Sequence, residues 1–438
     1  MRFLPRFPLH VAAAALAATC AVLMTAAPAA AEFDTPEAPA DDQGPCSPPP
    51  DQLPSLSARA WAIDFIGIDD AHQYNRGTFD DGTPVTIAVI DSGVQADLPI
   101  FGDRVLDGFD PWDPGSKGKC DQYFHGTGVA AIAAGGAEGT QFVGVAPEAH
   151  ILPLRAFQAG EGADFARSEM VASLINDAVA NGADVINVSL VLPPTAALEQ
   201  AVENAVAENV VIVAATGNAN LAMDDPSLPD KDALFYPANY PSVIAVGGNN
   251  PSGNFYKDTN YGENIDLLAP GEKVTFPYPG GGWQDDSGTS YAAPYVAGAA
   301  ALLKGEFGKD RTPAWIEQRL RETAIHPPND FNIFQGYGVL NLTRALSNPV
   351  DEEETGEPVE PTEAASQDSG PLIDSIQVGH DPLATEKTIA WASMGIAALL
   401  ITLVLVMRKV IPKGRRRRWR PGTRKSDALP VKPEADTA

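Results

Sequence analysis

Cysteine is the scarcest residue type in the chain, with 3 copies among 438 residues. Cys20 lies in an N-terminal segment that we expect to be removed, which leaves Cys46 and Cys120. Two cysteines can form one intramolecular disulfide or remain a free pair, and an oxidising compartment favours the disulfide. Three cysteines without paired histidines give no sign of a structural zinc site. We predict neither a metal nor a cofactor.

Basic residues are also few, because 30 Lys and Arg stand against 57 Asp and Glu, a formal net charge of −27. Between residues 32 and 407 the count is 17 basic against 54 acidic residues. Such a surface argues against nucleic acid or anionic lipid as an exterior partner. From Arg408 onward the balance reverses, with 11 basic and 3 acidic residues.

The N-terminus has the order of a secretory signal peptide. Basic residues Arg2 and Arg6 precede an apolar stretch, residues 11–24, and three small residues end at Ala31. A first transmembrane anchor is the alternative, but its apolar core would be longer. We therefore expect export, with cleavage of residues 1–31.

Near the C-terminus, residues 388–407 form an apolar run without a charged side chain. About twenty such residues can cross a bilayer as a helix. A buried soluble helix is the alternative, but the basic cluster that follows favours a span with a cytoplasmic tail, residues 408–438. We expect a single-pass protein of the cell membrane, anchored in the lipid bilayer, with the bulk of the chain outside the cytoplasm.

Three segments lie between the two ends. Residues 32–59 are rich in Pro, Asp and Ala, and residues 349–387 are acidic and contain Pro. Neither composition can bury a core, so we interpret them as an irregular strap and a linker. Residues 60–348 remain as one globular domain of a size that supports a large core.

Apolar β-branched runs alternate with helical patterns inside this domain. The predicted strands cover residues 85–90, 150–157, 183–190, 209–217 and 242–248, and the predicted helices include 167–182 and 195–209. The runs show little polar alternation, so both faces of the sheet should be covered. The pattern predicts an α/β fold, a mostly parallel sheet with helices on both faces.

Three polar residues stand where strand ends and helix N-termini would meet. Asp91 ends the run VTIAVI, His125 opens HGTGVAAIAAGG, and Ser290 opens a run of small apolar residues. Each has an ordinary alternative role, as turn former, helix-start residue and N-cap respectively. Together they supply an acid, a base and a hydroxyl nucleophile, the set that acyl transfer needs.

The surrounding sequence resembles the subtilisin-like serine proteases. VTIAVIDSGV, HGTGVAAIAAG and GTSYAAPYVAGAAALL are similar, in this order, to the three catalytic blocks of that family. The resemblance implies that Asp91 orients the base, His125 is the general base and Ser290 is the nucleophile. It further implies that Asn218 donates a hydrogen bond to the oxyanion.

The same resemblance implies that Ser189, Leu190 and Val191 pair with the backbone of the substrate. Family members often carry Gly where this chain has Val191, so its bulk should alter the substrate groove. Residues 219–237 could form one wall of that groove or only a surface excursion.

The order of segments is similar, more narrowly, to the mycosins, membrane-anchored proteases of type VII secretion systems. This resemblance implies exported protein substrates, secretion-complex subunits as partners, and a Cys46–Cys120 disulfide that straps the extension beside His125. The extension is too short for a folding prodomain, which favours a structural strap over an inhibitory propeptide.

Two other functions stay open at this point. One is a structural component that stabilises a secretion complex, with proteolysis secondary, and the other is a degradative protease. Calcium binding is undecided, because the acidic residues form no contiguous loop with ligand spacing and are explained by a solvated surface. Glycosylation motifs begin at Asn187 and Asn341, but Asn187 falls in a predicted buried strand.

Overall fold

The computed structural model of the chain describes residues 47–137, 139, 141–158, 163–225, 227–229 and 233–347. The predicted signal peptide, linker, membrane span and tail lie outside these residues, as does Cys46. Among the residues described, no helix is both long and apolar enough to span a bilayer.

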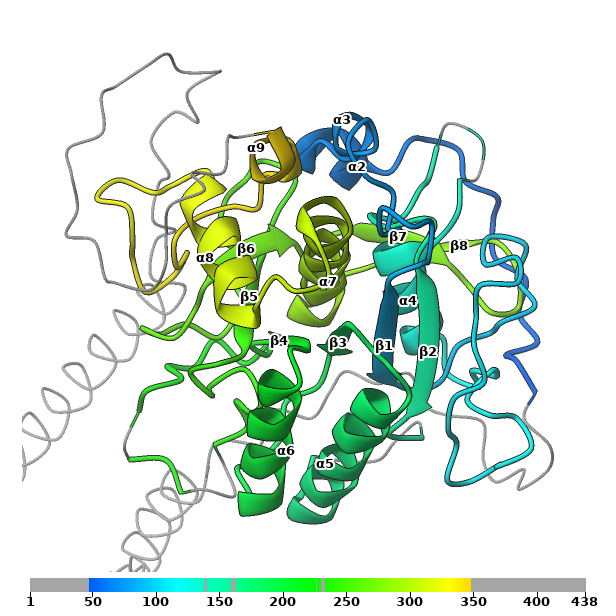
Figure 1. Cartoon of the computed structure of the whole chain (residues 1–438), viewed down its shortest axis with the longest axis horizontal. Helices are drawn as coiled ribbons and strands as arrows, with labels where there is room; N and C mark the ends of the chain where they lie inside the picture. Colours follow the sequence, from blue (N-terminus) through cyan, green and yellow to red (C-terminus); the bar gives the residue numbers. More distant parts are fainter. Residues whose placement is uncertain are drawn as a thin grey trace, which may run out of the picture. The chain divides into compact units, whose positions relative to one another are not determined.

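A six-stranded parallel sheet with the order β2-β1-β3-β4-β5-β6 forms the centre of the domain (Figure 1). Its strands are β1 (Thr86–Asp91), β2 (His150–Arg155), β3 (Val185–Val188), β4 (Val211–Ala215), β5 (Ile244–Asn249) and β6 (Leu267–Pro270). The chain moves outward from β1 to β2 and then crosses back to β3, so β1 lies between them. The carboxyl ends of β1 and its neighbours therefore meet at one edge, where sites in parallel sheets are usually built.

Helices cover both faces of the sheet, as the sequence predicts. Helices α4 (His125–Ala134) and α7 (Thr289–Phe307) lie on one face, and α5 (Phe165–Ala180) and α6 (Ala196–Ala207) lie on the other (Figure 1). Alternate residues of β1 join the two separate cores, Ile87 and Val89 on the α4 side and Ala88 and Ile90 on the α5 side. The remaining helices are α2 (Trp61–Ile66), α3 (Ile68–Ala71), α8 (Pro313–Thr323) and α9 (Leu342–Ser347).

The small residues of α7 allow it to pack directly against α4. A Cβ added at Gly298 would lie 2.5 Å from the Cβ of Val145 and 2.9 Å from the carbonyl oxygen of Ala133 in α4. Only glycine leaves room for this approach, which explains why the run after Ser290 is rich in Gly and Ala.

The five predicted strands correspond to β1 to β5, and the two predicted helices correspond to α5 and α6. The sequence analysis missed β6 and the antiparallel pair β7 (Val274–Pro277) and β8 (Trp283–Asp286). Each of these strands has four residues, as β3 does, but β3 lies in the longer predicted run 183–190, whereas these three carry no extended apolar run that marks them as strands.

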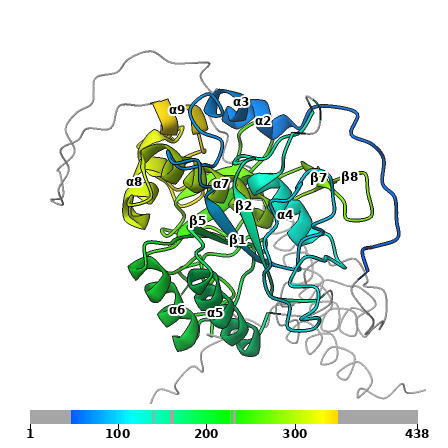
Figure 2. The same ribbon diagram turned by 45° about the vertical axis from the view of Figure 1, so that its right-hand side comes forward.

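Part of the predicted strap packs against the β7–β8 pair. The amide of Leu53 donates to the carbonyl of Gly281 at 3.0 Å, and the amide of Trp283 donates to the carbonyl of Pro54 at 2.9 Å. Figure 2 shows this blue segment passing beside the two strands. Residues 51–54 thus lie against the turn between β7 and β8, where a Cβ at Gly282 would clash with the Leu53 carbonyl.

Candidate active site

Asp91 is the last residue of β1 and its side chain is fully buried. One carboxylate oxygen, Oδ1, accepts from the amide of Ser92 at 2.7 Å and contacts the His125 ring at Nδ1, 2.8 Å away. The start of α4 comes very close to this strand end. A Cβ at Gly126 would lie 2.1 Å from the carbonyl of Gly93, so glycine is needed there.

His125 is the first residue of α4 and bridges two polar side chains. Its Nδ1 lies 2.8 Å from Asp91 Oδ1, and its Nε2 lies 2.9 Å from Ser290 Oγ. Burial by itself lowers the pKa of His125, but the charge and hydrogen bond of Asp91, with the charges of Asp286 and Asp121, raise it above its ordinary value. The ring is therefore a stronger base than a free histidine.

A buried carboxylate that the sequence analysis missed, Asp121, holds the turn before His125. It accepts from the amides of Tyr123, Phe124 and Thr127 at 2.9 to 3.0 Å and from the Thr127 hydroxyl at 2.7 Å. Phe124 has φ 128°, a conformation that costs energy for any residue with a side chain. These hydrogen bonds stabilise the strained turn, so Asp121 fixes where His125 begins its helix.

Ser290 lies in the first turn of α7, and it is not the N-cap of this helix. The N-cap is Gly288, without a side-chain hydrogen bond, and Ser290 directs its Oγ at the imidazole. The capping role that the sequence leaves open for Ser290 is therefore wrong. Ser290 is largely buried, with 8% of the residue exposed.

Asn218 follows β4 and is exposed, with its side chain fixed by Thr289. The Asn218 Oδ1 accepts from the amide of Thr289 at 2.8 Å and from its hydroxyl at 3.0 Å. The amide nitrogen is thereby turned away from Thr289. A Cβ at Gly288 would lie 3.2 Å from Asn218 Nδ2 and 3.1 Å from Ser290 Oγ, so a small gap separates donor and hydroxyl.

The three residues predicted to pair with substrate follow β3. Ser189 donates its hydroxyl to the carbonyl of Ser290 at 2.7 Å and accepts from Asn187 at 2.9 Å, so its side chain is held beneath the site. Leu190 is buried, and a Cγ of Val191 would lie 3.0 Å from a Cβ placed at Gly217. The Val191 side chain thus occupies space next to the loop that carries Asn218. Asn187 is fully buried.

Aromatic rings surround the imidazole of His125. The ring centroid of Tyr291 lies 5.0 Å from it, and those of Phe157 and Tyr123 lie 6.3 and 6.4 Å away. Tyr291 also donates its hydroxyl to Asp286 at 2.7 Å. This arrangement limits the positions of the ring and places Asp286 close to the site.

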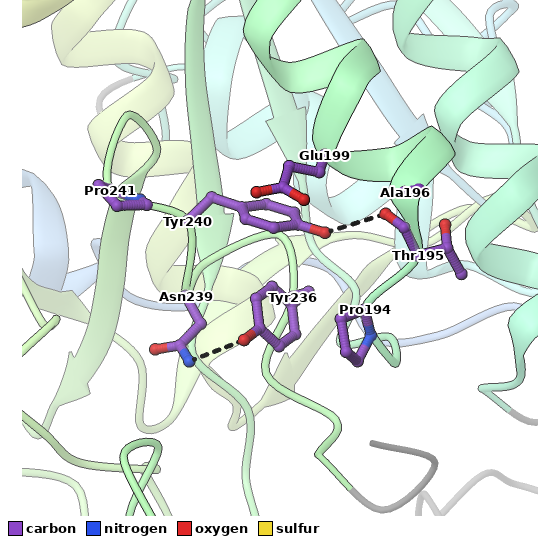
Figure 3. A pocket seen from close by; sticks show the side chains of 8 residues that line it. All are labelled: Pro194, Thr195, Ala196, Glu199, Tyr236, Asn239, Tyr240 and Pro241. Atoms are coloured by element: carbon purple, nitrogen blue, oxygen red, sulfur yellow. Dashed lines mark hydrogen bonds between the residues drawn. The ribbon is translucent and has the colours of Figure 1, made fainter.

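Other features of the described residues do not suggest a second chemistry. These residues contain no group of three or more His, Cys, Asp or Glu that could hold a metal ion. A hollow of about 410 Å³ beside α6 contains none of the predicted site residues (Figure 3). Two of its polar groups are already paired, since Tyr240 donates to the Thr195 carbonyl at 3.3 Å and Asn239 donates to the Tyr236 hydroxyl at 3.4 Å.

The comparisons with known proteins show the family of the chain. The family model described as Peptidase S8, subtilase family, matches residues 82–341. The chain belongs to the subtilase family. Subtilisin BL from Lederbergia lenta is 35% identical over 293 residues, which cover 65% of this subtilase and 97% of subtilisin BL. Membership in the subtilase family and the similarity to subtilisin BL identify the protein as a serine endopeptidase.

Solved structures of mycosins are similar to this subtilase. MycP1 from Mycobacterium smegmatis matches with a TM-score of 0.61 and 28% identity, and the match covers 76% of this chain and 100% of the solved MycP1 chain. The MycP3 protease from the type VII (ESX-3) secretion system matches with a TM-score of 0.57 and 28% identity over 72% of this chain and all of MycP3. The predicted likeness to mycosins is confirmed.

Proposed function

We propose that this subtilase is a membrane-anchored endopeptidase that cleaves exported proteins in association with a type VII secretion system. Asp91, His125 and Ser290 would carry the chemistry, and Asn218 would bind the oxyanion. The observation that carries the catalytic part is the continuous hydrogen-bonded chain from Asp91 Oδ1 through the imidazole to Ser290 Oγ, with links of 2.8 and 2.9 Å.

Acylation begins when Ser290 Oγ attacks the carbonyl carbon of the scissile peptide. The His125 Nε2 takes the hydroxyl proton, and Asp91 stabilises the imidazolium that forms while holding Nδ1–H in the required tautomer. The tetrahedral intermediate then collapses, its C–N bond breaks, and His125 gives the proton to the leaving amine. Water repeats the sequence on the acyl-enzyme, with His125 as the base again, and releases the carboxylic acid.

The oxyanion of the tetrahedral intermediate would lie in the gap beside Gly288. The Asn218 amide, which lies beside this gap, and the backbone N–H of Ser290 would be the donors to the oxyanion. Because Thr289 already fixes Asn218 Oδ1, the Nδ2 donor needs no reorientation when the charge develops.

The cellular setting rests on the predicted segments and on the mycosin neighbours. MycP1 is described as a serine protease and an essential component of the type VII (ESX-1) secretion system. In this proposal residues 1–31 are cleaved, residues 349–387 link the catalytic domain to the span 388–407, and residues 408–438 stay in the cytoplasm. Ser189, Leu190 and Val191 would bind the backbone of an exported substrate.

The predicted disulfide belongs to the same proposal. Cys120 is disulfide-bonded, and we propose Cys46 as its partner. The bond would tie the strap, residues 32–59, to the loop directly before Asp121 and His125. This strap already contacts the β7–β8 turn through Leu53 and Pro54.

A fluorophosphonate serine probe tests the catalytic proposal. The oxidised full-length protein in detergent should be labelled once, at Ser290, and both Ser290→Ala and His125→Ala should abolish labelling. Absence of labelling of the folded wild type would contradict the proposal. The alternative function, a structural component of a secretion complex, would then be favoured.

Cells that carry only the Ser290→Ala chain separate the two roles. If proteolysis is the function, uncleaved exported substrates should accumulate while the secretion complex stays intact. Normal processing in these cells would contradict the protease role, and a complex that depends on the chain but not on Ser290 would support the structural one.

A further inference from the structure

The loop that carries Asn218 is held from beneath by a buried asparagine, Asn260, in the connection between β5 and β6. Asn260 is 2% exposed. Its side-chain Nδ2 donates to the carbonyl of Thr216 at 2.8 Å, and its Oδ1 accepts from the amides of Ala219 and Leu221, both at 3.0 Å. Its backbone amide also donates to the carbonyl of Gly217 at 2.9 Å.

These four hydrogen bonds flank Asn218 on both sides but do not include it. Two are made to residues 216 and 217 before it, and two to residues 219 and 221 after it. The contact is close, because a Cβ at Gly217 would lie 2.5 Å from Asn260 Nδ2. Gly217 has φ 100°, a conformation that favours glycine and that turns the chain around the asparagine amide.

Asn218 is thus held by two residues. Thr289 fixes its side-chain amide through Oδ1 and also accepts from the amide of Gly217 at 3.0 Å, whereas Asn260 holds the main chain on both sides of Asn218. A donor must lie within about 2.7–3.1 Å of the oxyanion to be effective, so a shift of the main chain would weaken it even with Thr289 in place.

We propose that Asn260 is a positioning residue for the oxyanion donor. The proposal rests on the proposed role of Asn218 and names the residue that holds this donor at the correct distance from Ser290. Asn260 touches neither the nucleophile nor the base, so its effect should reach the reaction only through Asn218.

A double-mutant cycle on the full-length protein tests this dependence, with the rate of fluorophosphonate labelling as the readout. Phosphonylation of Ser290 develops a negatively charged oxygen, as peptide cleavage does, and it requires no known substrate. Asn260→Ala should lower the second-order labelling rate by about 10- to 100-fold, since a misplacement near 1 Å can cost that much. In the Asn218→Ala background the same change should lower the rate by less than about 2-fold.

Asn75, which is half-buried, offers a control for loss of a side chain that holds a loop. Its side chain donates to the Thr78 carbonyl at 3.0 Å and accepts from the amides of Gly77 and Thr78 at 2.7 and 3.2 Å. Asn75→Ala removes these hydrogen bonds and one to Glu306, so it should lower thermal stability without lowering the labelling rate of the folded protein.

A second variant covers the case in which Asn260→Ala does not fold. Asn260→Asp keeps an Oδ1 acceptor for Ala219 and Leu221, but it replaces the donor to Thr216 with an acceptor and can add a negative charge on the oxyanion side. Its labelling rate should therefore fall below that of the wild type, as for Asn260→Ala. The pH dependence of labelling should keep its acid limb in Asn260→Ala, because the charges around His125 are unchanged.

Three results would overturn the proposal. If Asn260→Ala lowers the labelling rate equally in the wild type and in Asn218→Ala, Asn260 has a general structural role. If Asn260→Ala and Asn260→Asp both label at the wild-type rate, the hydrogen bonds of Asn260 are dispensable. If Asn218→Ala itself labels at the wild-type rate, the role of Asn218 fails, and the positioning role fails with it. The last result leaves the His125-dependent part of the proposed function standing.

Discussion

The two sides of Ser290 are built from side chains of opposite character. On the His125 side the groups nearest the imidazole are the carboxylates Asp91, Asp121 and Asp286, together with aromatic rings. On the Asn218 side the polar side chains are neutral. They are the hydroxyl of Thr289 and the amides of Asn218 and Asn260.

This difference matches the charge that each side would stabilise in the proposed reaction. The imidazole would become a cation, so negative charge around it favours the proton transfer. The substrate oxygen becomes an anion, so a carboxylate beside it would oppose catalysis and only neutral donors in fixed positions help. The reaction rate should therefore depend on nearby charges on the His125 side and on the positions of the hydrogen-bond donors on the Asn218 side.

The largest effect should come from removal of the base. His125→Ala should reduce kcat by about 10⁶-fold, the order of loss known for subtilisin, because Ser290 then has no proton acceptor. Hydrolysis of labelled casein by the full-length protein measures it, with the exposed His326→Ala as a matched control. A loss below 100-fold would show that another group accepts the proton.

Removal of the oxyanion donor should have a smaller effect of a different kind. Asn218→Ala should lower kcat by about 10²- to 10³-fold, the range known for the same donor in subtilisin, with KM nearly unchanged. The acid limb of the pH profile should stay in place because no charge near His125 changes. A shifted limb would mean that the two sides of the site are electrostatically coupled.

The fold could be predicted because its signals are local, and the proposed catalytic residues carry local signals as well. The apolar runs that contain β1 to β5 are continuous, and Asp91, His125 and Ser290 each adjoin a distinctive block. The strand β6 and the β7–β8 pair lie outside any such extended run.

The supporting residues could not be predicted because their roles depend on approach between distant segments. Asn260 stands in the polar stretch YKDTNYGEN, where it resembles an ordinary loop residue, and only the fold brings it beneath residues 216–221. Asp121 likewise looks like a surface acid in CDQYF, yet it is fully buried. A buried polar residue needs its partners in view before its role can be read.

Gly288→Ala tests whether position alone controls the oxyanion side. The added methyl would lie 3.1 Å from Ser290 Oγ and 3.2 Å from Asn218 Nδ2, in the gap proposed for the oxyanion. Gly288 has φ 169°, which alanine adopts easily, so the fold should persist. We expect kcat to fall by about 10- to 100-fold. Wild-type kcat in casein hydrolysis would place the oxyanion elsewhere.

The smallest effect, and the one most specific to charge, should come from Asp286→Asn. Asn keeps an acceptor for the Tyr291 hydroxyl but removes one of the charges that raise the pKa of His125. The pKa of His125 should fall, so neutral imidazole persists to lower pH. The acid limb of kcat/KM should therefore move to lower pH by about a few tenths of a unit.

The neighbouring Asp285 is the control for this change. It is exposed and accepts a hydrogen bond from Thr275 rather than from Tyr291. Asp285→Asn removes the same formal charge one residue away and should leave the acid limb nearly in place. The shift caused by Asp286→Asn should shrink with added salt, since the charge is partly solvated. A shift of equal size in both variants would mean that net charge, and not the placement of Asp286, sets the basicity of His125.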